Sequence, residues 1–152
     1  MIIPFPQQHR ETKVAAVFPL CANGTRTVPL YASPVSAGFP SLAEEYTEGQ
    51  IDLNEQLIDH PNDTFVVKVS GDSMIDAGIH PDDLLIVDRA RSPESGSVVI
   101  AVINGELTVK RLVKQAASLY LMPENPGYPG IEITEDMHFM VWGVVTNVIH
   151  PL

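Results

Sequence analysis

Cysteine and positive charge are both scarce in this sequence. The single cysteine, Cys21, excludes an intramolecular disulfide and any zinc site built from several thiolates. Nine lysines and arginines stand against 19 aspartates and glutamates, which gives a formal net charge of −10 at pH 7. Because phosphate binding needs clustered basic side chains, we expect no direct sequence-specific DNA binding. We also expect no metal and no cofactor, and any role at DNA would run through another protein.

Long apolar runs are absent as well. The longest near the N terminus, VAAVFPLCA from Val14 to Ala22, is far shorter than the ~20 residues of a membrane helix and contains Pro19. The small residues VSA, ending at Ala37, would suit a signal-peptide cleavage position, and Lys13 precedes the apolar run. The polar stretch NGTRTVPLY separates that run from Ala37, however. We therefore expect a cytoplasmic protein.

Proline is concentrated at the start of the chain. Six of the 13 prolines fall within the first 40 residues, and the apolar residues there follow neither a helical nor a strand periodicity. We therefore predict an extended, irregular N-terminal arm over residues 1–40 and a folded body over residues 41–152. The body should open with two short helices: one from Ser41, with Glu44 completing a capping box, and one over residues 51–61, with Asp52 near its start and Pro61 as its stop.

Beyond residue 61 the pattern changes to short runs rich in Val and Ile, separated by turn residues. Asn104-Gly105 predicts a β-hairpin, because both central residues of a type I′ turn need positive φ. Short strands at close spacing with little helix predict a mainly β fold, a compact barrel-like body of packed, twisted sheets. The predicted strands are TFVVKVS, LLIVD, SVVIAVI, ELTVKRLV, SLYLM and FMVWGVVTNVI.

Candidate catalytic chemistry begins at VSGDSMIDAGI, residues 69–79. Gly71 allows a tight turn after a strand, which would present Ser73 beside free backbone N–H groups able to bind an oxyanion. A serine hydroxyl needs a base within about 3 Å. None of the histidines sits in a recognisable Ser-His-Asp context, so we expect them to be solvated surface side chains; they are His9, His60, His80, His138 and His150.

Lys110 is the better candidate for the base. It lies in the strand run LTVKRLV, where burial would disfavour the ammonium form and leave a neutral amine able to accept a proton from Ser73. Nearby acidic residues such as Asp72, Asp76 and Glu106 would oppose this if they came close. On composition alone, a turn serine and a solvated strand lysine remain the simpler interpretation.

Three stretches carry a family resemblance: SGDSMIDAGI, DDLLIVDRA and GSVVIAVINGELTVKRL. They resemble the LexA-like self-cleaving serine peptidases and, within them, the UmuD-type accessory proteins of error-prone translesion DNA polymerases. The resemblance runs from about Ala37 to Val148. Its spacing is specific, because Lys110 follows Ser73 by 37 residues and Gly38 precedes Ser73 by 35. It implies a LexA/signal-peptidase-like version of the predicted β body.

The resemblance also implies roles for individual residues. Ser73 would be the nucleophile and Lys110 the general base, with the backbone N–H groups of Asp72 and Ser73 as the oxyanion hole. The bond cut would be Ala37-Gly38 in the protein's own arm. Ala37 suits a small specificity pocket, and Gly38 lets the backbone approach closely.

The partners implied are a second copy in a homodimer, a RecA filament on single-stranded DNA as the trigger, and a Y-family translesion polymerase catalytic subunit (UmuC-like). The processed product, residues 38–152, would activate that polymerase in SOS mutagenesis. A LexA-type repressor is disfavoured, because no pair of helices can be drawn in the 37 residues before Gly38. A non-catalytic β-rich interaction subunit and a signal-peptidase-like protease stay open, as does cleavage in cis or in trans. Cys21 is assigned no role.

Overall fold

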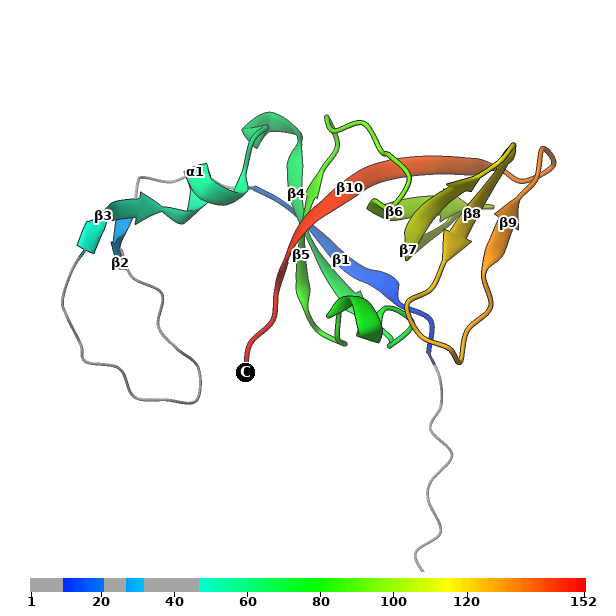
Figure 1. The fold of residues 1–152 in the computed structure, drawn as a ribbon, viewed down its shortest axis with the longest axis horizontal. Coiled ribbons are helices and arrows are strands. Elements are labelled where there is room, and N and C mark those ends of the chain that lie inside the picture. Colours follow the sequence, from blue (N-terminus) through cyan, green and yellow to red (C-terminus); the bar gives the residue numbers. More distant parts are fainter. Residues whose placement is uncertain (1–9, 21–26, 32–46) are drawn as a thin grey trace, which may run out of the picture. The chain divides into compact units, whose positions relative to one another are not determined.

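The computed structural model describes residues 10–20, 27–31 and 47–152, and the chain divides into two compact units (Figure 1). The larger unit combines residues 1–20 with residues 60–152, and the smaller comprises residues 21–59. The predicted cleavage positions Ala37 and Gly38 lie outside the described residues, as do Ser41 and Glu44 of the first predicted helix. None of the helices in the described ranges is long and apolar enough to cross a membrane.

The larger unit is a closed antiparallel barrel. Its strands follow the order β1-β4-β5-β10-β6-β7, and pairing of Lys13 in β1 with Thr108 in β7 closes the ring. A further antiparallel pair, β8 and β9, continues the sheet from β7. The strands are β1 (Lys13–Pro19), β4 (Thr64–Ser70), β5 (Leu84–Asp88), β6 (Val98–Ile103), β7 (Glu106–Gln115), β8 (Ser118–Met122), β9 (Ile131–Ile133) and β10 (Phe139–Ile149).

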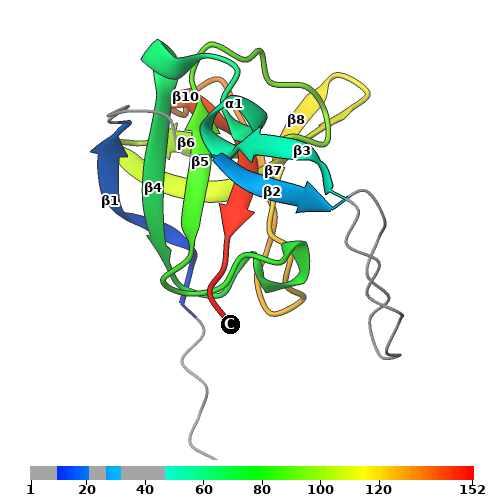
Figure 2. The same cartoon turned by 90° about the vertical axis from the view of Figure 1, so that its left-hand side faces the viewer.

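The mainly β, barrel-like prediction is therefore confirmed, and each of the predicted Val- and Ile-rich runs forms a strand. Figure 2 shows β1, β4 and β5 as neighbouring strands of this sheet. Helix is limited to single 3₁₀ turns at Pro61–Asp63 and Ile75–Ala77 in this unit. The short strand β9 was not predicted, because a run of three residues gives almost no periodic signal.

Strand β6 supplies two hydrophobic clusters at once. Alternate side chains of a strand point to opposite faces, so Ile100 enters one cluster while Val99 and Ala101 enter the other. This explains why the strand is apolar throughout instead of alternating with polar residues. The first cluster comprises Val67, Val69, Met74, Ile79, Leu85, Val87, Ile100 and Val109, and the second Val99, Ala101, Leu112, Leu121 and Val144.

The β6–β7 hairpin confirms the turn prediction. Asn104 and Gly105 have φ of 48° and 85°, as a type I′ turn requires, and Ile103 pairs with Glu106 across it. A two-residue turn fixes the register of the whole hairpin, which places Lys110 opposite Val99. The local chemistry of the turn thus determines where Lys110 lies along the barrel.

The prediction of an irregular arm over residues 1–40 was wrong for Lys13–Pro19, which forms β1 and pairs with β4, and for Thr27–Tyr31, which forms strand β2. The clustered prolines concealed a proline-free run of strand length, KVAAVF. Pro19 is tolerated because it stands at the last position of the strand. This segment of the predicted arm is an integral barrel strand.

The smaller unit contains an antiparallel pair, β2 (Thr27–Tyr31) and β3 (Thr47–Asp52), followed by α1 (Leu53–Leu57). The helix predicted over residues 51–61 is therefore shorter than expected, and Ile51 belongs to the strand. Asp52 does mark the helix start, because its side chain accepts a hydrogen bond of 2.9 Å from the backbone N–H of Asn54. Formation of β3 by residues 47–52 explains the later start.

A buried carboxylate fastens the end of β5. Asp88 is 3% exposed, its Oδ2 lies 2.6 Å from Nδ1 of His60, and its Oδ1 accepts hydrogen bonds from the backbone N–H groups of Ala90 and Arg91. Burial by itself raises the pKa of Asp88, but the hydrogen bond and charge of His60 and the two backbone donors outweigh it, so the pKa is lowered.

Replacing this carboxylate, Asp88→Asn, should lower the free energy of unfolding at neutral pH by about 1–3 kcal/mol, because a charged buried acceptor is lost. The pKa of Asp88 is lower in the folded protein than its value of about 3.9 in the unfolded chain. The carboxylate therefore contributes its full stabilisation above about pH 3.9, and this contribution is lost as the pH falls through the pKa of the folded state. The difference between wild type and variant should therefore shrink below about pH 4. Urea unfolding across pH measures it. The exposed Glu135→Gln is the control, and an undiminished difference in acid would contradict the assignment.

Candidate catalytic site

Ser73 lies in the connection that follows β4. Gly71 turns the chain there with a φ of 83°, as the sequence predicts, and Ser73 is fully buried. Its carbonyl accepts a hydrogen bond of 2.9 Å from the N–H of Glu124, and the N–H of Ile75 bonds to the carbonyl of Asp72. The serine is thus held on both sides by backbone hydrogen bonds, which fix the position of its hydroxyl.

Lys110 reaches the same place from β7. Its side chain is 1% exposed, and Nζ lies 3.1 Å from Oγ of Ser73. Further contacts of Nζ are Oγ1 of Thr108 and the carbonyl of Val109, each at 3.3 Å. The structure therefore brings the two candidate residues together. The lysine is buried, which contradicts the simpler interpretation of Lys110 as a solvated strand residue.

A third group completes the contacts of the lysine. Oε2 of Glu11 lies 2.5 Å from Nζ of Lys110, and the N–H of the next residue, Thr12, donates a 2.8 Å hydrogen bond to Oγ of Ser73. The carbonyl of Arg10 accepts a 2.7 Å hydrogen bond from the N–H of Asp72. Residues 10–12, which immediately precede β1, therefore cover the Ser73–Lys110 pair.

This cover engages the side chains of both Ser73 and Lys110. Oγ of Ser73 accepts hydrogen bonds from the N–H of Thr12 and from Nζ of Lys110. Nζ of Lys110 also forms an ion pair with the carboxylate of Glu11. We call this arrangement, in which residues 11 and 12 contact both members of the pair, the resting geometry.

Gly71 makes room for this main chain. A Cβ at position 71 would lie 2.0 Å from the carbonyl oxygen of Glu11 and 2.5 Å from that of Arg10. Only glycine therefore lets a peptide backbone lie so close to the turn that carries Ser73. The N–H of Asp72, one of the two predicted oxyanion donors, already binds a peptide carbonyl here. The turn that carries Ser73 is thus in close main-chain contact with residues 10 and 11.

Two further side chains position the Ser73 turn. Nδ2 of Asn125 donates a 3.0 Å hydrogen bond to the carbonyl of Asp72, and the hydroxyl of Tyr128 donates one of 2.5 Å to Oδ1 of the same residue. Burial and the Asp72 carboxylate raise the pKa of Tyr128, so the phenol stays protonated as a donor. Sequence analysis missed both, because PENPGY carries only turn signals and no catalytic motif.

A cavity of about 450 Å³ adjoins the lysine. Its walls combine the apolar side chains of Ile103, Leu107 and Ile131 with the polar groups of Glu11, Thr108 and Lys110. Glu106 also lines the cavity, and its carboxylate lies 3.9 Å from Nζ of Lys13.

Of the predicted surface histidines, His60 and His150 are exposed and His80 is half-buried, but each of the three contacts a carboxylate. His60 contacts Asp88, while His80 and His150 both contact Asp83. His138 is exposed, as predicted, and His9 lies outside the described residues. Lys110 is therefore the titratable side chain hydrogen-bonded to Ser73 in the part of the chain that the structure covers.

Comparison with known proteins now identifies the family. A model described as "Peptidase S24-like" matches residues 29–146. The chain belongs to this family. Curated relatives include protein SamA of Salmonella typhimurium, 45% identical over 82% of this chain and 86% of the relative, and protein MucA of Escherichia coli, 40% identical over 86% of this chain and 91% of the relative. The predicted kinship with LexA-like peptidases of the UmuD type is thereby confirmed.

A LexA repressor is also related to this S24-like chain. The repressor of Paracidovorax citrulli is 39% identical over 76% of the chain, but that match covers only 51% of the repressor. The chain therefore corresponds to about half of that protein, whereas it covers most of SamA and MucA.

Reactivity of Ser73 provides a test of the resting geometry. A fluorophosphonate that modifies nucleophilic serines should label the Glu11→Gln variant about tenfold or more faster than wild type at neutral pH. A charge-assisted hydrogen bond is worth about 1.5–3 kcal/mol, and its loss makes it easier for residues 11 and 12 to leave Ser73. Mass spectrometry of the labelled peptide measures the rate. Glu106→Gln removes a carboxylate from the same cavity without touching Lys110; an equal gain in that control would contradict the special role of Glu11.

Proposed function

We propose that the chain is a self-cleaving serine endopeptidase, with Ser73 as the nucleophile and Lys110 as the general base. The observation that carries the proposal is the 3.1 Å separation of Nζ and Oγ in a buried site, in a member of the S24-like peptidase family. Such a separation allows direct proton transfer between the two groups. The bond proposed to be cut is Ala37-Gly38, either in the same molecule or in a second copy of it.

The chemistry follows from the groups present. Neutral Lys110 accepts the proton of Ser73 as Oγ attacks the carbonyl carbon of Ala37, and the N–H groups of Asp72 and Ser73 stabilise the resulting oxyanion. The intermediate collapses when Lys110 donates that proton to the amide nitrogen of Gly38. Residues 38–152 leave with a new amino terminus, and water activated by Lys110 then hydrolyses the Ala37 ester on Ser73. Small side chains at 37 and 38 suit a site that holds a main chain close to the Ser73 turn.

The resting contacts make cleavage conditional. Residues 10–12 occupy the main-chain positions beside Ser73, so the segment around Ala37 can enter only after they have left. Departure of Glu11 also breaks its ion pair with Nζ of Lys110. A single displacement thus frees both Ser73 and Lys110 for reaction. About 26 residues separate Gly38 from Thr64, which gives enough reach for cleavage in cis or in trans.

The biological role we propose is that of an SOS mutagenesis protein. Support comes from the UmuD-type motifs and from similarity to SamA, MucA and ImpA over most of the chain. In this role a RecA filament on single-stranded DNA shifts the population toward the cleavage-competent pose, and the 38–152 product, as a homodimer, joins a Y-family polymerase subunit in the cytoplasm. The net charge of −10 suits a protein that reaches DNA through such partners.

Incubation of the purified protein should yield fragments that end at Ala37 and begin at Gly38. Cleavage should accelerate at alkaline pH, because the ammonium form of Lys110 cannot accept a proton, and should accelerate with RecA on single-stranded DNA. Ser73→Ala and Lys110→Ala should each abolish it, with rates at least about a thousandfold lower. Intact-mass spectrometry over time identifies the bond and its rate.

Lys114→Ala is a matched control, since Lys114 lies on the same strand but is exposed and should leave cleavage unchanged. An Ala37-Gly38 bond that survives every condition in wild type would favour a non-catalytic interaction subunit. Cleavage of an added secretory peptide, with the protein's own bond left intact, would favour a signal-peptidase-like enzyme instead.

A further inference from the structure

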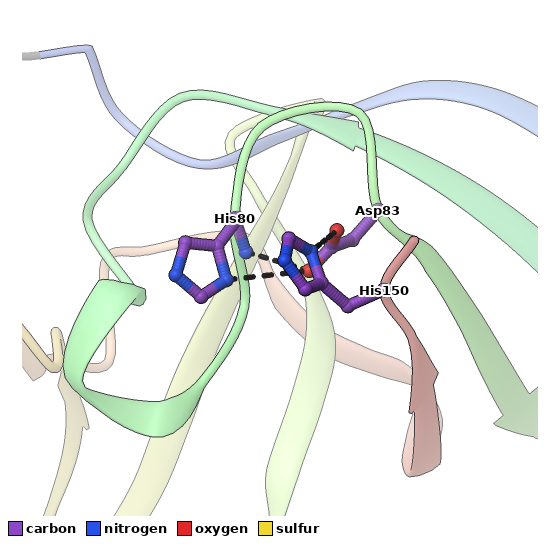
Figure 3. Close-up of side chains that lie close together, drawn as sticks. All are labelled: His80, Asp83 and His150. Atoms are coloured by element: carbon purple, nitrogen blue, oxygen red, sulfur yellow. Dashed lines mark hydrogen bonds and ion pairs between the residues drawn. The ribbon is translucent and has the colours of Figure 1, made fainter. Parts of the chain in front are cut away.

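A second cluster of titratable side chains lies at one end of the barrel. Leu84, which begins β5, pairs with Ile149, which ends β10. Asp83 immediately precedes β5, and His150 immediately follows β10. Because the two strands are antiparallel, both residues lie at the same end of the sheet. A tight turn brings in the third residue: the N–H of Asp83 bonds to the carbonyl of His80, and Oδ2 of Asp83 accepts a 2.8 Å hydrogen bond from the N–H of His80 (Figure 3).

The carboxylate of Asp83 is approached by Nδ1 of both imidazole rings. It is 1% exposed, and Nδ1 of His150 lies 2.6 Å from its Oδ1. Nδ1 of His80 faces the other oxygen, Oδ2, at 3.7 Å, which is too long for a hydrogen bond. The rings themselves are close, with centroids 4.5 Å apart and planes inclined by 32°. Figure 3 shows both rings directed toward the aspartate.

One atom of this cluster is unsatisfied. Nδ1 of His80 is buried and has no hydrogen-bond partner, although it faces a carboxylate oxygen. A cation placed between this nitrogen and the carboxylate would bind both, because each group can donate a lone pair to it.

We propose that His80, Asp83 and His150 bind a zinc ion. Their ligand atoms all lie within 4.8 Å of one another, and tetrahedral zinc with bonds of 2.0–2.2 Å needs about 3.3–3.5 Å between ligand atoms. Small rotations of the two histidines supply the difference, since their side chains are 41% and 42% exposed. Two imidazoles and one carboxylate match zinc better than magnesium or calcium, which prefer all-oxygen ligands. The exposed side of the cluster leaves a fourth position for water.

The bound ion would link two parts of the fold. His150 follows β10, and His80 and Asp83 lie in the connection between β4 and β5, which also carries Ser73. The turn is already held to β4, because the N–H of Val69 bonds to the carbonyl of Asp83 and the N–H of Asp82 to the carbonyl of Val69. Zinc adds a link from this turn to the end of β10. The site is independent of the proposed peptidase chemistry.

Calorimetric titration of the untagged full-length protein with Zn²⁺ tests the proposal. We expect one ion per chain, and an affinity at least about tenfold weaker in His80→Ala and in His150→Ala, because each loses a ligand. Zinc should raise the melting temperature of wild type but not of these variants. Bound Co²⁺ should show the intense visible absorption of a tetrahedral site in wild type only.

His138→Ala is the matched control, because it removes an exposed histidine outside the cluster and should bind zinc as wild type does. If His150→Ala does not fold, a variant truncated after Ile149 can be used in its place. The truncation removes His150 without altering the barrel strands. The proposal is overturned if the His80 and His150 variants bind zinc as tightly as wild type, or if His138→Ala weakens binding equally.

Discussion

Pairing of β1 with both β4 and β7 is the constraint on which the rest of this structure depends. It closes the barrel and brings the end of β4 beside the strand that carries Lys110. Ser73 follows β4 directly, so side chains separated by 37 residues meet at hydrogen-bonding distance. The Asn104-Gly105 turn then fixes the register that points the lysine at the serine. Catalytic geometry here is a property of strand order and register.

The buried lysine creates a second requirement, because an ammonium group removed from water needs a compensating charge. Glu11 provides it at 2.5 Å, from the segment that leads into β1. This ion pair fastens the segment before β1 to β7. Glu11 itself belongs neither to β7 nor to the connection that carries Ser73.

The parts of the fold predictable from sequence were those with local causes. Val- and Ile-rich runs gave β4 to β8 and β10, and the Asn104-Gly105 and Gly71 signals came from backbone sterics. Ser73 and Lys110 were found through family motifs. The strand β1, the contacts of Glu11 and Tyr128, and the His80–Asp83–His150 cluster arise only when distant strands pair. The single cysteine excludes metal sites built from several thiolates, but it gives no information about metal sites built from imidazoles.

The cover over Ser73 is the beginning of a strand and not a separate lid. Residues 10–12 precede Lys13, where the pairing with β4 and β7 starts, and Thr12 is fully buried. The carbonyl of Thr12 also accepts a 3.3 Å hydrogen bond from the N–H of Val109 in β7, next to the pairing that closes the barrel. Strand ends open locally at lower free energy than global unfolding. Exposure of the Ser73–Lys110 pair is thus coupled to local unfolding at the closing seam of the barrel.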